Sequence, residues 1–180
     1  MNLIFRLFIR LLWAELQRRF RGPTGLLDEI RLTFRCLPTD LDANLHLTNS
    51  RYFSFMDIVR VAMMVRSGTW QRIRTAKLMP VLGSSSIRYR RAVKPFQQFT
   101  VTCRVIGWDD RWLFLEHRIL IDGKTGEDAA AIAVMKTAFL GPDGRVATDK
   151  LIEVVGFQGT KPDSGPLIDR VRDVDAALTA

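Results

Sequence analysis

The stretch from Asp40 to Tyr52 holds most of the side chains in this sequence that could perform chemistry together. Its thirteen residues include two carboxylates, two carboxamides, an imidazole and a phenol, and His46 is one of only two histidines in the chain. Polar groups are costly to bury unless they are bonded or take part in function. We therefore expect the functional site in this stretch, the motif segment.

Written as D-x-D-x-N-x-H-x-x-N-x-x-Y, the motif segment resembles the hot dog-fold thioesterases. Among them it is most similar to the acyl-acyl-carrier-protein thioesterases and the thioesterase superfamily member six group. Further matching pieces follow in a consistent order over residues 28–160, namely Pro38-Thr-Asp-Leu-Asp42, Arg88-Tyr-Arg-Arg91 with Lys94-Pro-Phe96, and Gly107-Trp-Asp-Asp-Arg111. The resemblance implies an α+β hot dog fold, in which a curved antiparallel sheet wraps around a long central helix. It also implies an acyl-CoA or acyl-carrier-protein thioesterase that forms a homodimer or homotetramer.

By this resemblance Asp42 is the catalytic residue. A carboxylate at this position can activate water as a general base, or can attack the thioester carbonyl directly. In an extended loop Asp42, Asn44 and His46 would project to one side, with Asn44 orienting water or substrate and His46 acting as acid or base. Backbone amides near Leu47–Asn49 are the expected oxyanion donors, because the first amides of a helix are unpaired and its dipole favours negative charge.

The polar residues of the motif segment also have structural interpretations. Asp40 can cap the loop by accepting hydrogen bonds from backbone amides, and Asn49 can be the N-cap of the following helix. Tyr52 falls at a core position, where its hydroxyl needs only a hydrogen-bond partner. Asn44 and His46 stay open as residues that shape the loop.

The basic run Arg88-Tyr-Arg-Arg91, followed by Lys94, is the candidate contact for the phosphates of coenzyme A or pantetheine. Alternation along a strand would place Arg88 and Arg90 on one face, with Arg91 on the other. A solvated basic face explains the same pattern equally well. The predicted substrate-binding residues are Leu47, Thr48, Asn49, Tyr52, Arg88, Arg90 and Arg91.

The net charge of +8 is concentrated in two segments, since residues 1–21 carry +4 and residues 84–104 carry +5. Such patches favour an anionic partner, which here is a membrane surface, the phosphates of coenzyme A or an acidic carrier protein. No nucleic-acid-binding motif accompanies the charge. Cys36 and Cys103 lie far apart in strand-like runs, so we expect reduced, buried thiols. We expect no metal and no cofactor, because no metal-binding spacing is present.

Residues 2–20 predict a helix with a wide apolar face and a stripe of arginines. Its polar residues recur near helical spacing, at Asn2, Arg6, Arg10, Gln17 and Arg21. Arg6 and Arg10 interrupt the apolar run that a transmembrane span requires, and no small-residue site for signal-peptide cleavage follows. We expect an interfacial anchor on an anionic membrane surface through residues 1–21, and a cytoplasmic protein that is peripheral on the inner membrane face. The alternatives are a helix packed on the domain or on a dimer partner, and a true transmembrane span.

The remaining sequence predicts one strand, a long helix and then a meander of strands. Strands are expected at Glu29–Leu37, Val81–Arg91, Phe99–Trp108, Trp112–Asp122, Ala129–Leu140 and Leu151–Phe157. Helices are expected at Asn49–Ser67 and Leu167–Leu178, and a helical connector should follow the first of them to about Lys77. Gly68 should end the long helix, and Asp122-Gly123 marks one of the turns. We expect His117 to be structural. The predicted organisation is an amphipathic helix (1–21), a hot dog domain (26–160) and a tail (161–180).

Two functions follow from these features. The first is an acyl thioesterase at a membrane surface. The second is a catalytically weak hot dog protein that binds acyl chains or acts as a scaffold at a membrane, because Leu45 replaces the glycine that many hot dog enzymes have before the motif histidine. The later Cys or Glu that the plant acyl-carrier-protein thioesterases add to their catalytic set also has no equivalent. A dehydratase or hydratase is disfavoured, because its arrangement of a histidine with an acidic residue is not found.

Overall fold

The computed structural model describes residues 2–121, 128–163 and 165–178 of the 180-residue chain. The helices are α1 (Asn2–Arg21), α2 (Asn49–Arg66), α3 (Thr69–Thr75), α4 (Thr148–Val155) and α5 (Pro166–Leu178), with a short 3-10 turn at Pro38–Asp40. The strands are β1 (Ile30–Arg35), β2 (Met79–Tyr89), β3 (Gln98–Trp108), β4 (Leu113–Ile121), β5 (Ala131–Gly141) and β6 (Gly144–Val146). The helices predicted at residues 2–20, 49–67 and 167–178 are confirmed.

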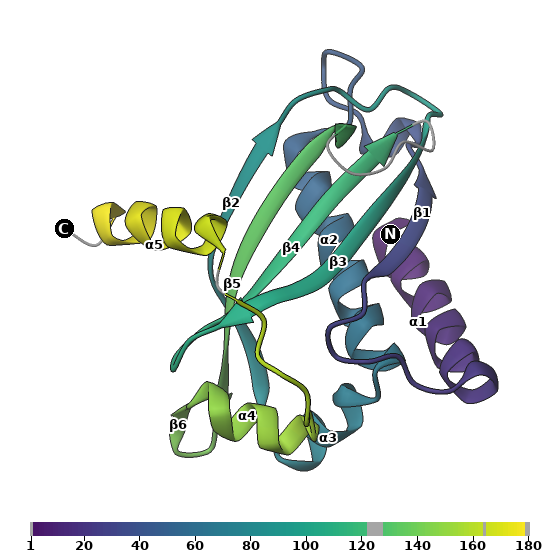
Figure 1. Cartoon of the computed structure of the whole chain (residues 1–180). Helices are drawn as coiled ribbons and strands as arrows, with labels where there is room; N and C mark the ends of the chain where they lie inside the picture. The colour runs from purple at the N-terminus through teal and green to yellow at the C-terminus, as the bar shows by residue number, and fades with distance from the viewer. Residues whose placement is uncertain (1, 122–127, 164, 179–180) are drawn as a thin grey trace.

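One antiparallel sheet has the strand order β1-β3-β4-β5-β2, and the short β6 pairs with β5. Strands β3, β4 and β5 are consecutive in the chain and in the sheet, while β1 and β2 form its two edges. Figure 1 shows the strands crossing over α2, with α1 beside α2 and β1. The predicted α+β arrangement of a curved antiparallel sheet around a central helix is confirmed.

A buried apolar stripe holds α2 against the sheet. The buried residues of the helix recur mostly at three- and four-residue spacing, and they are Tyr52, Phe55, Met56, Ile58, Val59, Ala62, Met63 and Met64. The ring of Phe55 lies 4.8 Å from that of Phe34 on β1 and 5.0 Å from that of Phe99 on β3. Gly68 follows the last turn with a φ of 73°, which glycine adopts without strain, so the predicted helix end is confirmed.

α5 packs against a small part of the outer face of the sheet. Its Ile168 and Val171 pack against Phe114 of β4 and Val134 of β5, forming a second small apolar cluster. Arg172 on the same helix lies 2.9 Å from a carboxylate oxygen of Asp109. This tail helix is therefore attached to the sheet by apolar packing and by charge.

His117 points into the core from β4, as its predicted structural role requires. The side chain is fully buried, with Nδ1 3.1 Å from the carbonyl oxygen of Thr102 and Nε2 3.7 Å from the sulfur of Cys103. Cys36 and Cys103 are free, buried thiols, as predicted. Burial, with a smaller contribution from the charge of Arg60, lowers the pKa of His117 to about 3.

This burial predicts a loss of stability in acid. Below about pH 6.5, the ordinary pKa of histidine, the unfolded chain binds a proton that folded His117 does not accept until about pH 3. The free energy of unfolding should therefore fall by up to about 1.4 kcal/mol per pH unit across that window. Thermal denaturation from about pH 7 to about pH 4 should show a shallower decline for His117→Gln than for wild type.

His46→Gln, which changes the other, half-buried histidine, is the control. An equal decline in wild type and His117→Gln would contradict this assignment.

Two strand predictions need correction. Residues 151–157 do not form a strand, because Leu151, Ile152 and Val155 lie on one face of helix α4 and pack against the core. Strand β2 ends at Tyr89, before the predicted Arg91, because the amides of residues 90 and 91 both donate to the carbonyl of Ala130. The strand end at residue 122 and the turn at residues 122–123 lie outside the described residues.

Candidate active site

Residues 41–47, the motif turn, form a tight turn and not the predicted extended loop. The amide of Asp42 donates to the carbonyl of His46 at 2.8 Å, and Leu41 forms an antiparallel bridge with Leu47. Leu45 has a φ of 57°, in the left-handed region that glycine occupies without strain. The expectation that alternation would project three side chains to one side is therefore wrong.

The carboxylate of Asp42 is exposed and is held in place by the motif turn itself. Its Oδ1 accepts hydrogen bonds from the amides of Asn44 at 2.9 Å and His46 at 3.1 Å. This pattern, in which an Asp side chain bonds amides a few residues ahead, stabilises a turn locally. Within the described ranges Oδ2 has no hydrogen-bond partner, so it remains available to water or substrate.

The side chains of Asn44 and His46 lie on the same turn as Asp42. Asn44 is exposed and His46 is half-buried. In the part of the chain that the structure describes, the side chains of Asn44 and His46 make no hydrogen bond to the carboxylate of Asp42, which bonds only their backbone amides. Their contribution to a shared site therefore comes from proximity within the motif turn, and their catalytic roles stay predictions.

The start of α2 offers fewer oxyanion donors than the sequence suggests. The amide of Leu47 donates to the carbonyl of Val93 at 2.9 Å, and the amide of Thr48 donates to the carbonyl of Asp40 at 3.0 Å. Thr48 is the N-cap residue, in place of the predicted Asn49, and its side chain makes no capping bond. Among the described residues, the amides of Asn49 and Ser50 have no acceptor, so they are the candidate donors at this helix end.

Tyr52 is buried directly behind the motif turn. Its hydroxyl has a backbone hydrogen bond with Val93, and its ring meets that of Tyr89 edge-on at 5.0 Å. Burial is the main cause that raises the pKa of Tyr52, and the nearby charge of Asp42 adds to it. The phenol therefore stays neutral near pH 7. This placement matches the core interpretation, and its contact with substrate stays a prediction.

Residues 90–97 pack against the motif segment and bring positive charge to it. Besides the bond between Val93 and the motif turn, the amide of Phe96 donates to the carbonyl of Cys36 at 2.9 Å. Lys94 is exposed on this loop, and Arg88 is exposed near the end of β2. Arg91 pairs with Asp128 at 3.3 Å, which commits part of its charge to the protein. The predicted phosphate contacts thus lie beside the motif segment at the same end of the sheet.

Asp40 anchors the motif segment from inside. It is fully buried, and its Oδ2 accepts hydrogen bonds from the amide of Leu37 at 3.0 Å and from the guanidinium of Arg6 at 2.9 Å. Arg51 lies 3.6 Å from the other oxygen. The predicted capping role is confirmed, but the bond to Arg6 comes from α1 and has no local sequence signal.

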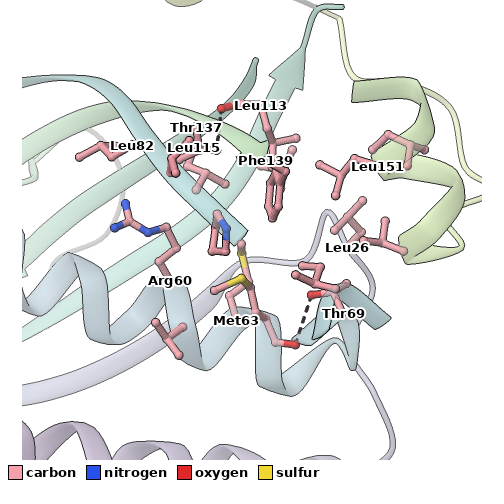
Figure 2. A pocket seen from close by; sticks show the side chains of 18 of the residues that line it. Leu26, Arg60, Met63, Thr69, Leu82, Leu113, Leu115, Thr137, Phe139 and Leu151 are labelled. Atoms are coloured by element: carbon pink, nitrogen blue, oxygen red, sulfur yellow. Dashed lines mark hydrogen bonds between the residues drawn. The ribbon is translucent and has the colours of Figure 1, made fainter. Parts of the chain in front are cut away.

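A separate apolar cavity of about 270 Å³ lies along the second half of α2. Figure 2 shows side chains from α2, the sheet and α4 around it, with Met63 and Phe139 entering from opposite sides. Both threonines labelled there donate hydrogen bonds from their hydroxyls to backbone carbonyls. Thr137 donates to the carbonyl of Leu113 at 3.1 Å, and Thr69 donates to the carbonyl of Met64 at 3.2 Å.

Arg60 is the basic residue of the cavity wall, and it pairs with Asp57 one helical turn before it. Asp57 is the first residue of α2 to reach the cavity. A helix rises about 1.5 Å per residue, so this end of the cavity is about 12 Å along the helix axis from Asn49. The cavity and the motif turn are therefore two distinct parts of the protomer.

The sequence and the structure both resemble known proteins. The sequence profile of the thioesterase-like superfamily matches residues 36–163. The chain is 33% identical over 114 residues to Protein THEM6 of Danio rerio, an alignment that covers 63% of this chain and 56% of that protein. It is 25% identical over 147 residues to a probable thioesterase of Saccharomyces cerevisiae, covering 80% of this chain and 61% of that one. The chain spans about half the length of the curated relatives it matches.

The structure is similar to that of YbaW, a probable thioesterase from Escherichia coli. The TM-score is 0.65 with 19% sequence identity, and the match covers 70% of this chain and 96% of that chain. At this identity the likeness shows the fold alone, and it confirms the predicted hot dog fold.

Proposed function

The chain belongs to the thioesterase-like superfamily, and we propose that it hydrolyses fatty acyl-CoA or acyl-carrier-protein thioesters, with Asp42 as general base or nucleophile. The observation that carries this proposal is the exposed carboxylate of Asp42, fixed by two amide hydrogen bonds a few residues before the open amides of α2. Two relatives of this chain are named as probable thioesterases, which supports the same chemistry.

In the general-base route, Asp42 removes a proton from water while the water oxygen attacks the thioester carbon. Negative charge develops on the carbonyl oxygen, where the amides of Asn49 and Ser50 can stabilise it. The carbon–sulfur bond then breaks, the thiolate leaves and takes up the proton, and the fatty acid is released. In the nucleophilic route, Asp42 attacks the same carbon, the carbon–sulfur bond breaks and the thiolate leaves as the anhydride forms. Water then hydrolyses the anhydride, which releases the fatty acid and restores the carboxylate of Asp42.

Asn44 and His46 are proposed to assist from the motif turn. Asn44 would orient the water or the substrate carbonyl, and His46 would donate or accept a proton, because both residues lie within four positions of Asp42. Arg88, Arg90 and Lys94 are proposed to contact phosphates of coenzyme A or of a pantetheine group. Their place beside the motif segment supports this, since guanidinium and ammonium groups suit phosphate oxygens.

The acyl chain is proposed to enter the apolar cavity next to α2. A second copy of the chain would complete the site, because edge strand β2 has an unpaired side and contributes Pro80, Val81 and Leu82 to the cavity wall. An exposed edge strand of this kind readily pairs with another chain. The partner's motif turn could then approach this cavity across the β2 edge, which would offset the distance between cavity and motif turn within one protomer.

A catalytically weak acyl-binding or scaffold protein is the second candidate. The observation that favours it is that, in the described part of the chain, no hydrogen bond links the side chain of Asp42 to the side chain of Asn44 or His46. Such a protein would use the cavity to hold an acyl chain and would release no thiol.

Thiol release from acyl-CoA esters of increasing chain length separates these two functions. We expect the purified chain to release thiol with a clear chain-length preference. If no acyl-CoA is cleaved, acyl-carrier-protein esters are the next substrates. Saturable binding of a fluorescent fatty acid without thiol release from either carrier would support the acyl-binding protein and contradict the thioesterase.

Filling the cavity should change this chain-length preference. Val61 lines the cavity and is only partly buried, so Val61→Phe can place its ring in the cavity without displacing a fully buried residue. We expect kcat/KM for long acyl chains to fall about tenfold or more relative to short chains. Each methylene of the acyl chain that loses its contact with the cavity wall reduces the preference for long chains. Val174→Phe on the exposed face of α5 is the control. An unchanged chain-length profile for Val61→Phe would exclude the cavity as the acyl site.

A further inference from the structure

The outward face of α1 is unusually apolar for a protein surface. Phe8 is 66% exposed and Phe20 is 81% exposed, and they belong to a set of exposed large apolar side chains on one helix. The exposed members are Ile4, Phe5, Phe8, Ile9, Leu12, Trp13, Leu16 and Phe20. A contiguous exposed patch of this size normally marks an interaction surface.

The arginine stripe of α1 faces the domain. A stripe that bound lipid headgroups would face away from the domain. Arg6 bonds Asp40, and Arg10 donates to the carbonyl of Thr33 at 2.5 Å. The two guanidinium groups also lie over the rings of Phe55 and Phe34, at 5.2 and 5.1 Å from their centroids. These inward bonds fix the rotation of the helix, so the apolar face is held outward by the fold.

Positive charge lies at the C-terminal end of this outward face. Arg18, Arg19 and Arg21 occupy the last turn, and Arg19 follows Leu16 by three residues and Leu12 by seven, which places it on the same side of the helix. Glu15 is the acidic residue of the helix, and its carboxylate already accepts a hydrogen bond from Arg18 at 2.9 Å. The outward surface therefore combines aromatic and aliphatic side chains with a net positive charge at its C-terminal end, where Arg18, Arg19 and Arg21 outnumber Glu15. Helices that bind anionic lipid surfaces have this composition.

From these observations we infer that the outward face of α1 binds the surface of an anionic lipid bilayer, with the helix lying in the interface plane. None of the helices in the described ranges has the length and apolar character needed to cross a membrane. The bond between Arg6 and Asp40 connects this helix to the motif segment, so lipid binding holds the motif turn close to the bilayer. The inference does not depend on the proposed function, because lipid binding can be measured without substrate.

Flotation of the full chain with lipid vesicles tests the inference. The vesicles are pure phosphatidylcholine or an equimolar mixture of phosphatidylcholine and phosphatidylglycerol. We expect binding to the anionic mixture, and a partition coefficient at least about tenfold lower for the triple variant Phe8→Ala, Leu12→Ala, Trp13→Ala, because three large apolar side chains no longer enter the interface. Arg19→Glu should weaken binding to the anionic vesicles and leave binding to pure phosphatidylcholine unchanged.

The matched control changes exposed apolar residues on another helix. Val174→Ala with Leu178→Ala on α5 should bind vesicles like wild type. Alanine favours helix and the replaced side chains are exposed, so circular dichroism should show all variants folded. Wild-type chain that stays unbound to anionic vesicles would overturn the inference. Self-association that the triple variant abolishes, without any vesicle binding, would assign the α1 face to a second copy of the chain instead.

Discussion

Asp42→Asn is expected to lower kcat for thioester hydrolysis by about 10²–10⁴-fold, the usual contribution of a positioned general base. The substitution removes the charge and the basicity of the carboxylate while keeping its size. The side-chain oxygen of asparagine can still accept the hydrogen bonds that Oδ1 of Asp42 receives from the amides of Asn44 and His46. The motif turn should therefore keep its shape, and KM should change little.

Asp143→Asn is the matched control for Asp42→Asn. Asp143 is an exposed carboxylate in the turn before β6, far from the motif segment in the chain. Its variant should have wild-type kcat, and both variants should have wild-type melting temperatures. If Asp42→Asn kept kcat within about twofold of wild type, Asp42 would have no catalytic role.

Arg6→Met is expected to reduce the free energy of unfolding by roughly 3 kcal/mol, because removing one partner of a buried ion pair leaves an uncompensated charge. Asp40 has no exposed surface, and Arg6 donates one of its two close hydrogen bonds. Arg51, at 3.6 Å, supplies partial compensation and keeps the expected loss at the lower end of the usual range. Methionine preserves the aliphatic length that packs beside Phe55.

A double-mutant cycle separates the ion pair from the packing. Arg6→Met combined with Asp40→Asn should be less destabilised than the sum of the two single variants, since neither group is then left charged alone. Arg19→Met, at an exposed arginine of the same helix, should change stability by no more than about 0.5 kcal/mol. Urea denaturation measures the wild type and all four variants. Additive losses in the cycle would show that Arg6 and Asp40 do not stabilise each other.

The fold was predictable from the sequence because its main elements have clear periodicity. The apolar spacing of α2 and the alternation of β1 are local patterns that follow from burial of one face. Strands β4 and β5 are buried on both faces, so they are short apolar runs bounded by turn residues. Residues 151–157 were ambiguous, because a short apolar run fits a strand as well as a helix. The structure resolves this run as α4, in which Leu151, Ile152 and Val155 face the core.

The motif segment was identified correctly as a polar cluster, but its geometry was not predictable. The motif turn depends on hydrogen bonds from the carboxylate of Asp42 to its own backbone, which compete with an extended conformation. The amides of Leu47 and Thr48 are occupied by carbonyls of Val93 and Asp40. One of those acceptors is distant in sequence, so no local pattern could show that Asn49 and Ser50 keep the open amides.

The orientation of α1 was also hidden in the sequence. A helical wheel separates the arginines from the apolar residues, but it does not say which side faces the domain. The partners of Arg6 and Arg10 lie 34 and 23 residues away. Only these tertiary bonds show that the arginines point inward, while Phe8 and its neighbours face outward.

Thioester hydrolysis by Asp42 is tested most directly by incubating the chain with its best acyl thioester in water enriched in oxygen-18. The released fatty acid is then measured by mass spectrometry. We predict that wild type releases fatty acid and thiol in equal amounts, with label from water in the new carboxyl group. The Asp42→Asn variant should release almost none over the same time. Absence of labelled acid from wild type, or equal release by Asp42→Asn, would contradict thioester hydrolysis by this aspartate.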